Sequence, residues 1–80
     1  MAVSKTEIRS WLQRGKDEGA THVLVACDTF DWEDYPVYVK PGETAREHAG
    51  RLGSAETIME VYDLSLDLEA QLAEVRAFHW

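Results

Sequence analysis

The sequence predicts a single α+β domain: a three-stranded antiparallel sheet with three helices, in the order α-β-β-α-β-α. Three observations support this prediction. A chain of 80 residues organises only one hydrophobic core. Helix-capping patterns precede segments with helical apolar spacing, and short runs rich in β-branched residues lie between them. The chain also contains no internal repeat and no linker long enough to separate two domains.

The first helix is predicted at residues 5–17. Ser4 and Glu7 have the spacing of a capping box, in which the serine hydroxyl accepts from the amide three residues later. Gly15 and Gly19 provide places where the helix can end. The helix presents one apolar stripe, formed by Ile8, Trp11 and Leu12.

Two strands follow the first helix. Residues 23–27 are apolar and rich in β-branched side chains, which is typical of a central strand buried on both faces. Residues 31–34 form a polar turn, and residues 35–39 then alternate as a second strand. Because Pro36 cannot donate to a strand ladder, we expect the second strand at an edge of the sheet.

The second half of the chain again shows capping patterns, helical spacing and a β-branched run. Thr44 and Glu47 have capping-box spacing before a short helix that is expected to end at Gly53, and residues 57–62 form the third strand. Ser65 is predicted to cap a final helix. The buried side of that helix is expected to consist of Leu68, Leu72, Val75 and Phe78.

Three helices are more than so small a sheet needs on both faces. We therefore expect part of one face to stay open, lined by Tyr38, Tyr62 and neighbouring aromatic side chains. An exposed aromatic face of this kind would serve as a partner or dimer surface.

The charge of the chain restricts its partners. Fifteen Asp and Glu residues against eight Lys and Arg give a net charge of −7, which repels nucleic-acid phosphates and anionic lipid. No stretch approaches the roughly 18 apolar residues of a membrane span, and residues 1–5 lack an apolar signal core. We expect a cytoplasmic protein that binds neither nucleic acid nor membrane directly and prefers a basic protein partner.

The single cysteine, Cys27, lies inside an apolar run, so we expect no internal disulfide and a reducing compartment; an intermolecular disulfide stays open. Cys27 with His22 or His48 could form a nucleophile and base, but a cysteine within an apolar strand is more often an inert core residue. His79 has no zinc-ligand spacing, and the glycines form no nucleotide-binding motif. We expect no enzyme and no cofactor.

Carboxylates and aromatic side chains are densest between the first two predicted strands. This segment fails the EF-hand pattern, because the required Gly and distal Glu are missing, so we expect no metal there. Aromatic anchors surrounded by acid suit a basic pocket on a partner protein. The alternative is a solvated hairpin with Trp32 folded back on the core. The candidate contact residues are Asp28, Asp31, Trp32, Glu33, Asp34 and Tyr35.

A second acidic set lies on the third strand and final helix. Carboxylates two apart on a strand lie about 6.6 Å from each other, and those four apart on a helix about 6 Å, close to the phosphate spacing of nucleic acid. This geometry permits DNA mimicry, whereas the alternative is an ordinary exposed surface that keeps the protein soluble. The candidate residues are Glu60, Asp63, Asp67 and Glu74, with Glu69 beside them.

Three stretches carry a resemblance to known sequences. Residues 27–39 read CDTFDWEDYPVYV, residues 59–65 read MEVYDLS, and residues 76–80 read RAFHW. In these stretches the chain resembles small acidic proteins encoded by bacteriophages and prophages. By size and charge it is also similar to anti-CRISPR proteins that bind a type I effector complex, with type I-C as one candidate.

This resemblance implies a phage-derived inhibitor acting in the bacterial host cell. A negative domain with an aromatic anchor would occlude the Lys- and Arg-rich surface on which such a complex holds DNA. A first rival is a protein that sequesters a signalling nucleotide through cations such as Arg46 and Arg51. A second is a phage accessory protein whose activity is self-association as a homodimer.

Overall fold

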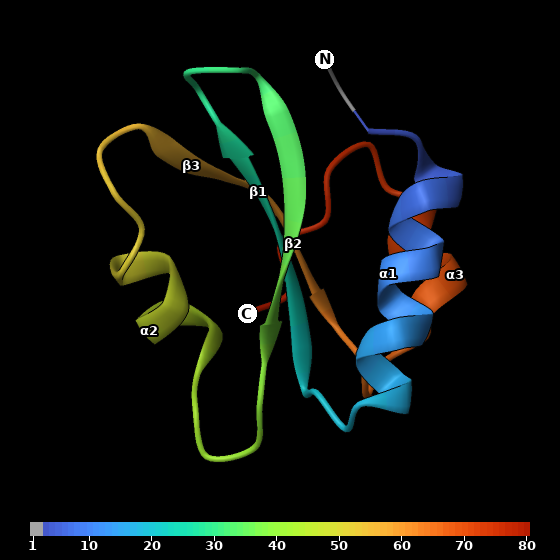
Figure 1. Ribbon diagram of the computed structural model, residues 1–80. Helices are drawn as coiled ribbons and strands as arrows, with labels where there is room; N and C mark the ends of the chain where they lie inside the picture. The colour runs from blue at the N-terminus through green and yellow to red at the C-terminus, as the bar shows by residue number, and fades with distance from the viewer. Residues whose placement is uncertain (1–2) are drawn as a thin grey trace.

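The computed structural model describes residues 3–80 (Figure 1). Met1 and Ala2, part of the segment expected to lack a signal core, lie outside the described residues. The predicted element order, three helices and one three-stranded antiparallel sheet, is confirmed. The elements are α1 (Lys5–Asp17), β1 (His22–Asp28), β2 (Glu33–Val39), α2 (Ala45–Gly50), β3 (Glu56–Asp63) and α3 (Leu68–Leu72).

Helix α1 has the predicted bounds. The Ser4 hydroxyl accepts from the Glu7 amide at 3.2 Å at its start. At its end, the Gly19 amide donates to the Lys16 carbonyl at 3.1 Å, and the Ala20 amide donates to the Gly15 carbonyl at 2.8 Å. These two bonds form a Schellman motif, which Gly19 permits because its φ is +77°.

The sheet has the order β2-β1-β3, so β1 is central and β2 lies at an edge, as its proline predicts. Residues 23–27 of β1 are all buried. The pairing of β1 with β3 shifts by one residue, because Val25 lies opposite Glu60 while Ala26 lies opposite Ile58. This bulge changes which side chains of β3 face each side of the sheet.

Helices α1 and α3 cover one face of the sheet, and the short α2 covers part of the other (Figure 1). Ala45 of α2 packs beside Leu24 and Val61. The larger core lies on the α1 side and consists of Ile8, Leu12, Val23, Val25, Tyr62, Leu64, Leu72 and Ala77.

The expectation of an open face lined by Tyr38 and Tyr62 is wrong. Both tyrosines lie opposite Val23 in the sheet register, so their side chains point to the α1 side. Tyr62 is fully buried and Tyr38 packs against the same core. The sequence alternation indicates that two residues share a face, but not which helix covers that face.

The predicted cap of the last helix is also wrong. The amide and hydroxyl of Ser65 both donate to Asp63 Oδ1, at 2.8 and 2.6 Å, in a turn before the helix. Asp67 caps α3 instead, because its Oδ1 accepts from the amides of Glu69 and Ala70.

Helix α3 ends at Leu72, and this short length corrects the predicted buried side. Leu72 is buried and Leu68 packs on the core, but Val75 is 95% exposed and Phe78 is 49% exposed. The C-terminal residues run beside β3, where the Val61 amide donates to the Ala77 carbonyl and the His79 amide donates to the Val61 carbonyl. Phe78 thereby forms a parallel bridge with Val61.

Candidate interaction site at the β1–β2 hairpin

Four residues join β1 to β2 in a tight loop. Asp28 and Glu33 are Cα partners at the ends of the two strands, and the Trp32 amide donates to the Asp28 carbonyl at 2.6 Å. Asp28 Oδ1 accepts from the Phe30 amide at 2.8 Å. The Thr29 amide and hydroxyl both donate to the Ala55 carbonyl, at 2.7 and 2.6 Å. The loop is thus held from within and from the segment that enters β3.

Trp32 adopts a φ of +57°, in the left-handed region. A bulky residue in this region is unfavourable by about 1–2 kcal/mol relative to glycine, because its Cβ crowds the following carbonyl oxygen. The loop geometry therefore favours glycine at this position, yet the sequence places a large aromatic residue there.

The loop presents two large aromatic side chains to solvent. Phe30 is 84% exposed and Trp32 is 61% exposed, so Trp32 does not fold back into the core. Asp31 and Glu33 are exposed beside them, and within residues 3–80 neither carboxylate has a hydrogen-bond or ion-pair partner. We call these four residues, Phe30, Asp31, Trp32 and Glu33, the hairpin tip.

A row of carboxylates crosses the sheet next to the hairpin tip. Asp28 lies opposite Glu33 on one side and opposite Glu56 on the other, so three acidic residues are neighbours on the α2 side. The sequence contains no Lys or Arg from residue 17 to residue 39. Like charges directly opposite each other on a sheet are destabilising, so this row concentrates negative charge at a cost in stability.

The other predicted contact residues of the hairpin are engaged internally. The Asp34 carboxylate accepts from the Val3 amide at 3.0 Å, and the Tyr35 hydroxyl donates to Glu56. Glu56 also accepts from the Gly53 amide at 3.1 Å. These contacts fasten β2 and the β3 entrance, and they leave Asp31 and Glu33 as the carboxylates available to a partner.

The second acidic set does not form one exposed face. Glu60 is only 8% exposed, and its Oε1 accepts from Lys5 Nζ, the Tyr62 hydroxyl and the Ala77 amide. Asp63 accepts from Ser65, and Asp67 caps α3. Glu74 pairs with His79 Nε2 at 2.9 Å. The structure therefore uses Glu60, Asp63, Asp67 and Glu74 to hold the fold, and it does not bring them next to the hairpin tip in the sheet register.

The cysteine–histidine pair considered from the sequence is not assembled. Cys27 is 4% exposed and has the same strand parity as Val23, whereas His22 lies on the opposite face of β1. Burial raises the pKa of the Cys27 thiol, and nearby Asp34 adds to this effect. His48 instead contacts Glu43 at 2.9 Å. A buried thiol with a raised pKa is a poor nucleophile.

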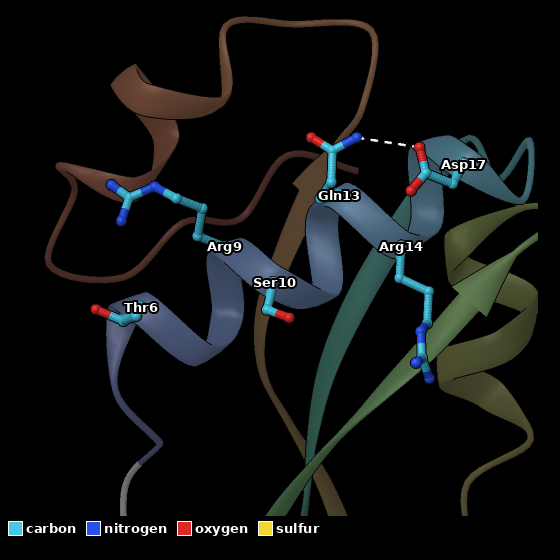
Figure 2. A pocket seen from close by; sticks show the side chains of 6 residues that line it. All are labelled: Thr6, Arg9, Ser10, Gln13, Arg14 and Asp17. Atoms are coloured by element: carbon cyan, nitrogen blue, oxygen red, sulfur yellow. Dashed lines mark hydrogen bonds between the residues drawn. The ribbon is translucent and has the colours of Figure 1, made fainter.

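A shallow groove of about 540 Å³ runs along α1 (Figure 2). One helix alone lines it, through Thr6, Arg9, Ser10, Gln13, Arg14 and Asp17. The Arg9 guanidinium forms an ion pair with Glu69 at 2.8 Å, and Gln13 donates to Asp17 at 3.1 Å. The groove has no second wall to enclose a small ligand.

Each of the two cations considered for nucleotide binding contacts a different side chain of the same protein. The Arg46 guanidinium lies over the Trp80 ring at 4.9 Å from its centroid, and Arg51 pairs with Glu47 at 3.7 Å. No group of three or more His, Cys, Asp or Glu side chains within residues 3–80 is arranged to hold a metal ion. No helix in the described part of the chain has the length and apolar character needed to cross a membrane.

These features define an α+β domain that displays an acidic, aromatic hairpin tip. No protein-family model, curated protein or solved structure matches the chain. The sequence indicated the hairpin, but the candidate contact residues did not include Phe30, its most exposed aromatic residue, and the stacking of Arg46 on Trp80 was not foreseen. The pairing of Asp28 with Glu33 could have been predicted from the sequence, because a four-residue hairpin loop places these two residues opposite each other.

Proposed function

We propose that this protein is a binding module that inhibits a nucleic-acid-handling complex by placing its hairpin tip on a basic surface of that complex. The observation that supports this function is the pair of exposed aromatic side chains, Phe30 and Trp32, flanked by two carboxylates without partners in the described chain. Large aromatic residues supply most of the binding energy at many interfaces, because they bury a large area in one pocket.

The charge distribution of the protein supports a partner with a basic surface. The hairpin tip and the row Glu33–Asp28–Glu56 lie at one end of the protein, and the segment from residue 17 to residue 39 contains no Lys or Arg. A concentrated negative end is attracted to a positive groove and is steered towards it at low ionic strength. Nucleic-acid-binding proteins present such grooves to hold phosphates.

The resemblance to small phage proteins makes a host defence complex the preferred target, with a type I CRISPR effector as the leading candidate. In this proposal the inhibitor is a non-enzymatic protein that acts in the bacterial cytoplasm. The carboxylates Asp31 and Glu33 take the place of DNA phosphates on the partner, while Phe30 and Trp32 fill apolar gaps between its basic side chains. DNA is then excluded from the same surface.

Sequestration of a nucleotide receives no support from a specific contact. A phosphate site needs convergent cations or backbone amides, and Arg46 and Arg51 are directed to Trp80 and Glu47.

The direct experiment mixes the purified protein with a type I-C effector complex that carries its guide RNA. We expect co-elution on a sizing column and loss of target-DNA binding. The variant D31K/E33K should lose both effects, because it reverses the two available carboxylates. The control variant E7K/D17K reverses two exposed carboxylates on α1 and should retain both effects. Independent elution with unchanged DNA binding would remove this complex as the target.

A further inference from the structure

We propose that the protein forms a twofold-symmetric dimer in which the hairpin tip of one copy packs against the C-terminal aromatic surface of the other. We define the C-terminal aromatic surface by Arg46, Phe78 and Trp80. This inference does not rest on the proposed function, because it concerns the protein alone in solution.

The exposed aromatic side chains gather on two surfaces of the protein. Six large hydrophobic residues of the described chain are exposed, and four of them are aromatic: two in the hairpin tip and two in the C-terminal aromatic surface. Phe78 is 49% exposed and Trp80 is 39% exposed. Such clustering is typical of interaction sites, whereas singly exposed residues such as Leu66 and Val75 need no explanation.

The two surfaces also carry opposite charges. Lys5, Arg9, Lys40 and Arg51 each pair with a carboxylate of the same chain. Arg46 pairs with none among residues 3–80 and instead stacks on Trp80. Asp31 and Glu33 lack cationic partners in the same described residues. An acidic aromatic surface and a cationic aromatic surface on one molecule are therefore complementary to each other.

The two surfaces lie at separate positions along the sheet. Glu33 and Asp28 share a strand face with Leu24, and Phe78 bridges Val61; Leu24 and Val61 both pack with Ala45 of α2. Glu33 of the hairpin tip and Phe78 of the C-terminal aromatic surface therefore lie on the α2 side of the sheet. Asp28 is four residues along β1 from Leu24, which is about 13 Å in a strand, so the hairpin tip lies towards the end remote from α2 (Figure 1).

This separation suits an isologous interface. A twofold axis that lies in the plane between two α2 sides packed face to face, perpendicular to the line joining the two surfaces, brings each hairpin tip opposite the partner copy's C-terminal aromatic surface. Both contacts form at once and the assembly closes at two copies, so no filament results. The dimer buries the hairpin tip, and self-association therefore competes with any other partner that uses it.

The test is a charge-swap experiment read by sedimentation equilibrium. The wild-type chain should be a dimer that dissociates on dilution and in high salt. D31K/E33K and R46E should each weaken the dimer by about tenfold or more, because like charges across an interface are strongly unfavourable. An equimolar mixture of the two variants should recover the dimer, since each hairpin tip then meets an opposite charge.

Arg14→Glu provides the matched control, because Arg14 lies on α1 and also has no carboxylate partner among residues 3–80. It should leave the dimer unchanged. Circular dichroism melting of every variant shows whether it is folded. A monomeric wild type at millimolar concentration would overturn the inference, as would a dimer insensitive to both variants or a folded mixture that stays monomeric.

Discussion

At the scale of single residues, Gly15 determines how closely α1 approaches the sheet. A Cβ at this position would lie 2.9 Å from Val23 Cγ2 and 3.0 Å from Leu64 Cδ1. We predict that Gly15→Ala lowers the free energy of unfolding by about 1–3 kcal/mol through overpacking, despite the better helix propensity of alanine. Urea denaturation measures this change.

Gly50 is the control for this prediction. It lies in α2, and no atom is within 4 Å of an added Cβ. Gly50→Ala should therefore keep the stability or raise it by up to about 1 kcal/mol. Equal effects of the two substitutions would show that helix propensity, rather than the contact with Val23, controls the result.

Ionisation of the Tyr62 phenol should lower the stability of the protein at alkaline pH. Burial, and after it the hydrogen bond to Glu60, raise the pKa of Tyr62 well above its ordinary value of 10.0. Below pH 10.0, the ordinary pKa of tyrosine, the phenol is neutral in both the folded and the unfolded chain. Above this pH the unfolded chain loses the proton, while the folded chain still keeps it. Stability should therefore fall as the pH rises past about 10.

Urea midpoints at about pH 8 and about pH 11 measure this loss in the wild type and in Tyr62→Phe. The phenylalanine variant should lose less stability between the two conditions. Some loss should remain, because burial also raises the pKa of Tyr38. The same loss in both proteins would contradict the assignment to Tyr62.

Residue-scale reasoning from the sequence was least able to place Glu60. Its neighbours alternate as in a half-exposed strand, so its carboxylate looked available for phosphate mimicry. In the structure it is 8% exposed and accepts from Lys5 and Ala77, which lie at opposite ends of the chain. Such long-range donors cannot be found from local spacing.

At the scale of elements, local signals predicted the first helix and the strand positions well. Ser4 and Gly19 fix the two ends of α1 by hydrogen bonds within a few residues, which are visible in the sequence. The predicted start of the last helix was wrong, because a local hydrogen bond that the spacing did not indicate competes for the expected cap. The turn made by Asp63 occupies Ser65, so Asp67, two residues later, caps the helix instead.

The corrected end of α3 makes a prediction of its own. Leu72 is 6% exposed and belongs to the main core, whereas Val75 lies beyond the helix and is 95% exposed. Leu72→Ala should lower the free energy of unfolding by about 2–5 kcal/mol. Val75→Ala should change it by less than about 0.5 kcal/mol. Similar losses at both positions would mean that the helix continues as the sequence pattern suggested.

At the scale of the whole molecule, composition predicted the acidic character but not its arrangement. The sequence shows fifteen acidic residues, and the fold divides them into those that hold the structure, such as Glu60 and Asp63, and those left available at the hairpin tip. The bulge between Val25 and Ala26 and the C-terminal segment beside β3 also arise from tertiary pairing. Neither has a local signature.

The central claim is that the hairpin tip is a contact surface rather than part of the core. Phe30→Ala with Trp32→Gly removes both exposed aromatic side chains, and glycine also suits the φ of +57° at position 32. We therefore expect the variant to keep its free energy of unfolding within about 1 kcal/mol.

The most direct measurement is the affinity of this double variant for the type I effector complex, by titration calorimetry beside the wild type. We predict a loss of affinity of about 100-fold with the fold intact, because two aromatic anchors contribute at least about 2–3 kcal/mol. A folded variant that binds as tightly as the wild type would contradict the account, since the exposed aromatic pair would then have no part in recognition.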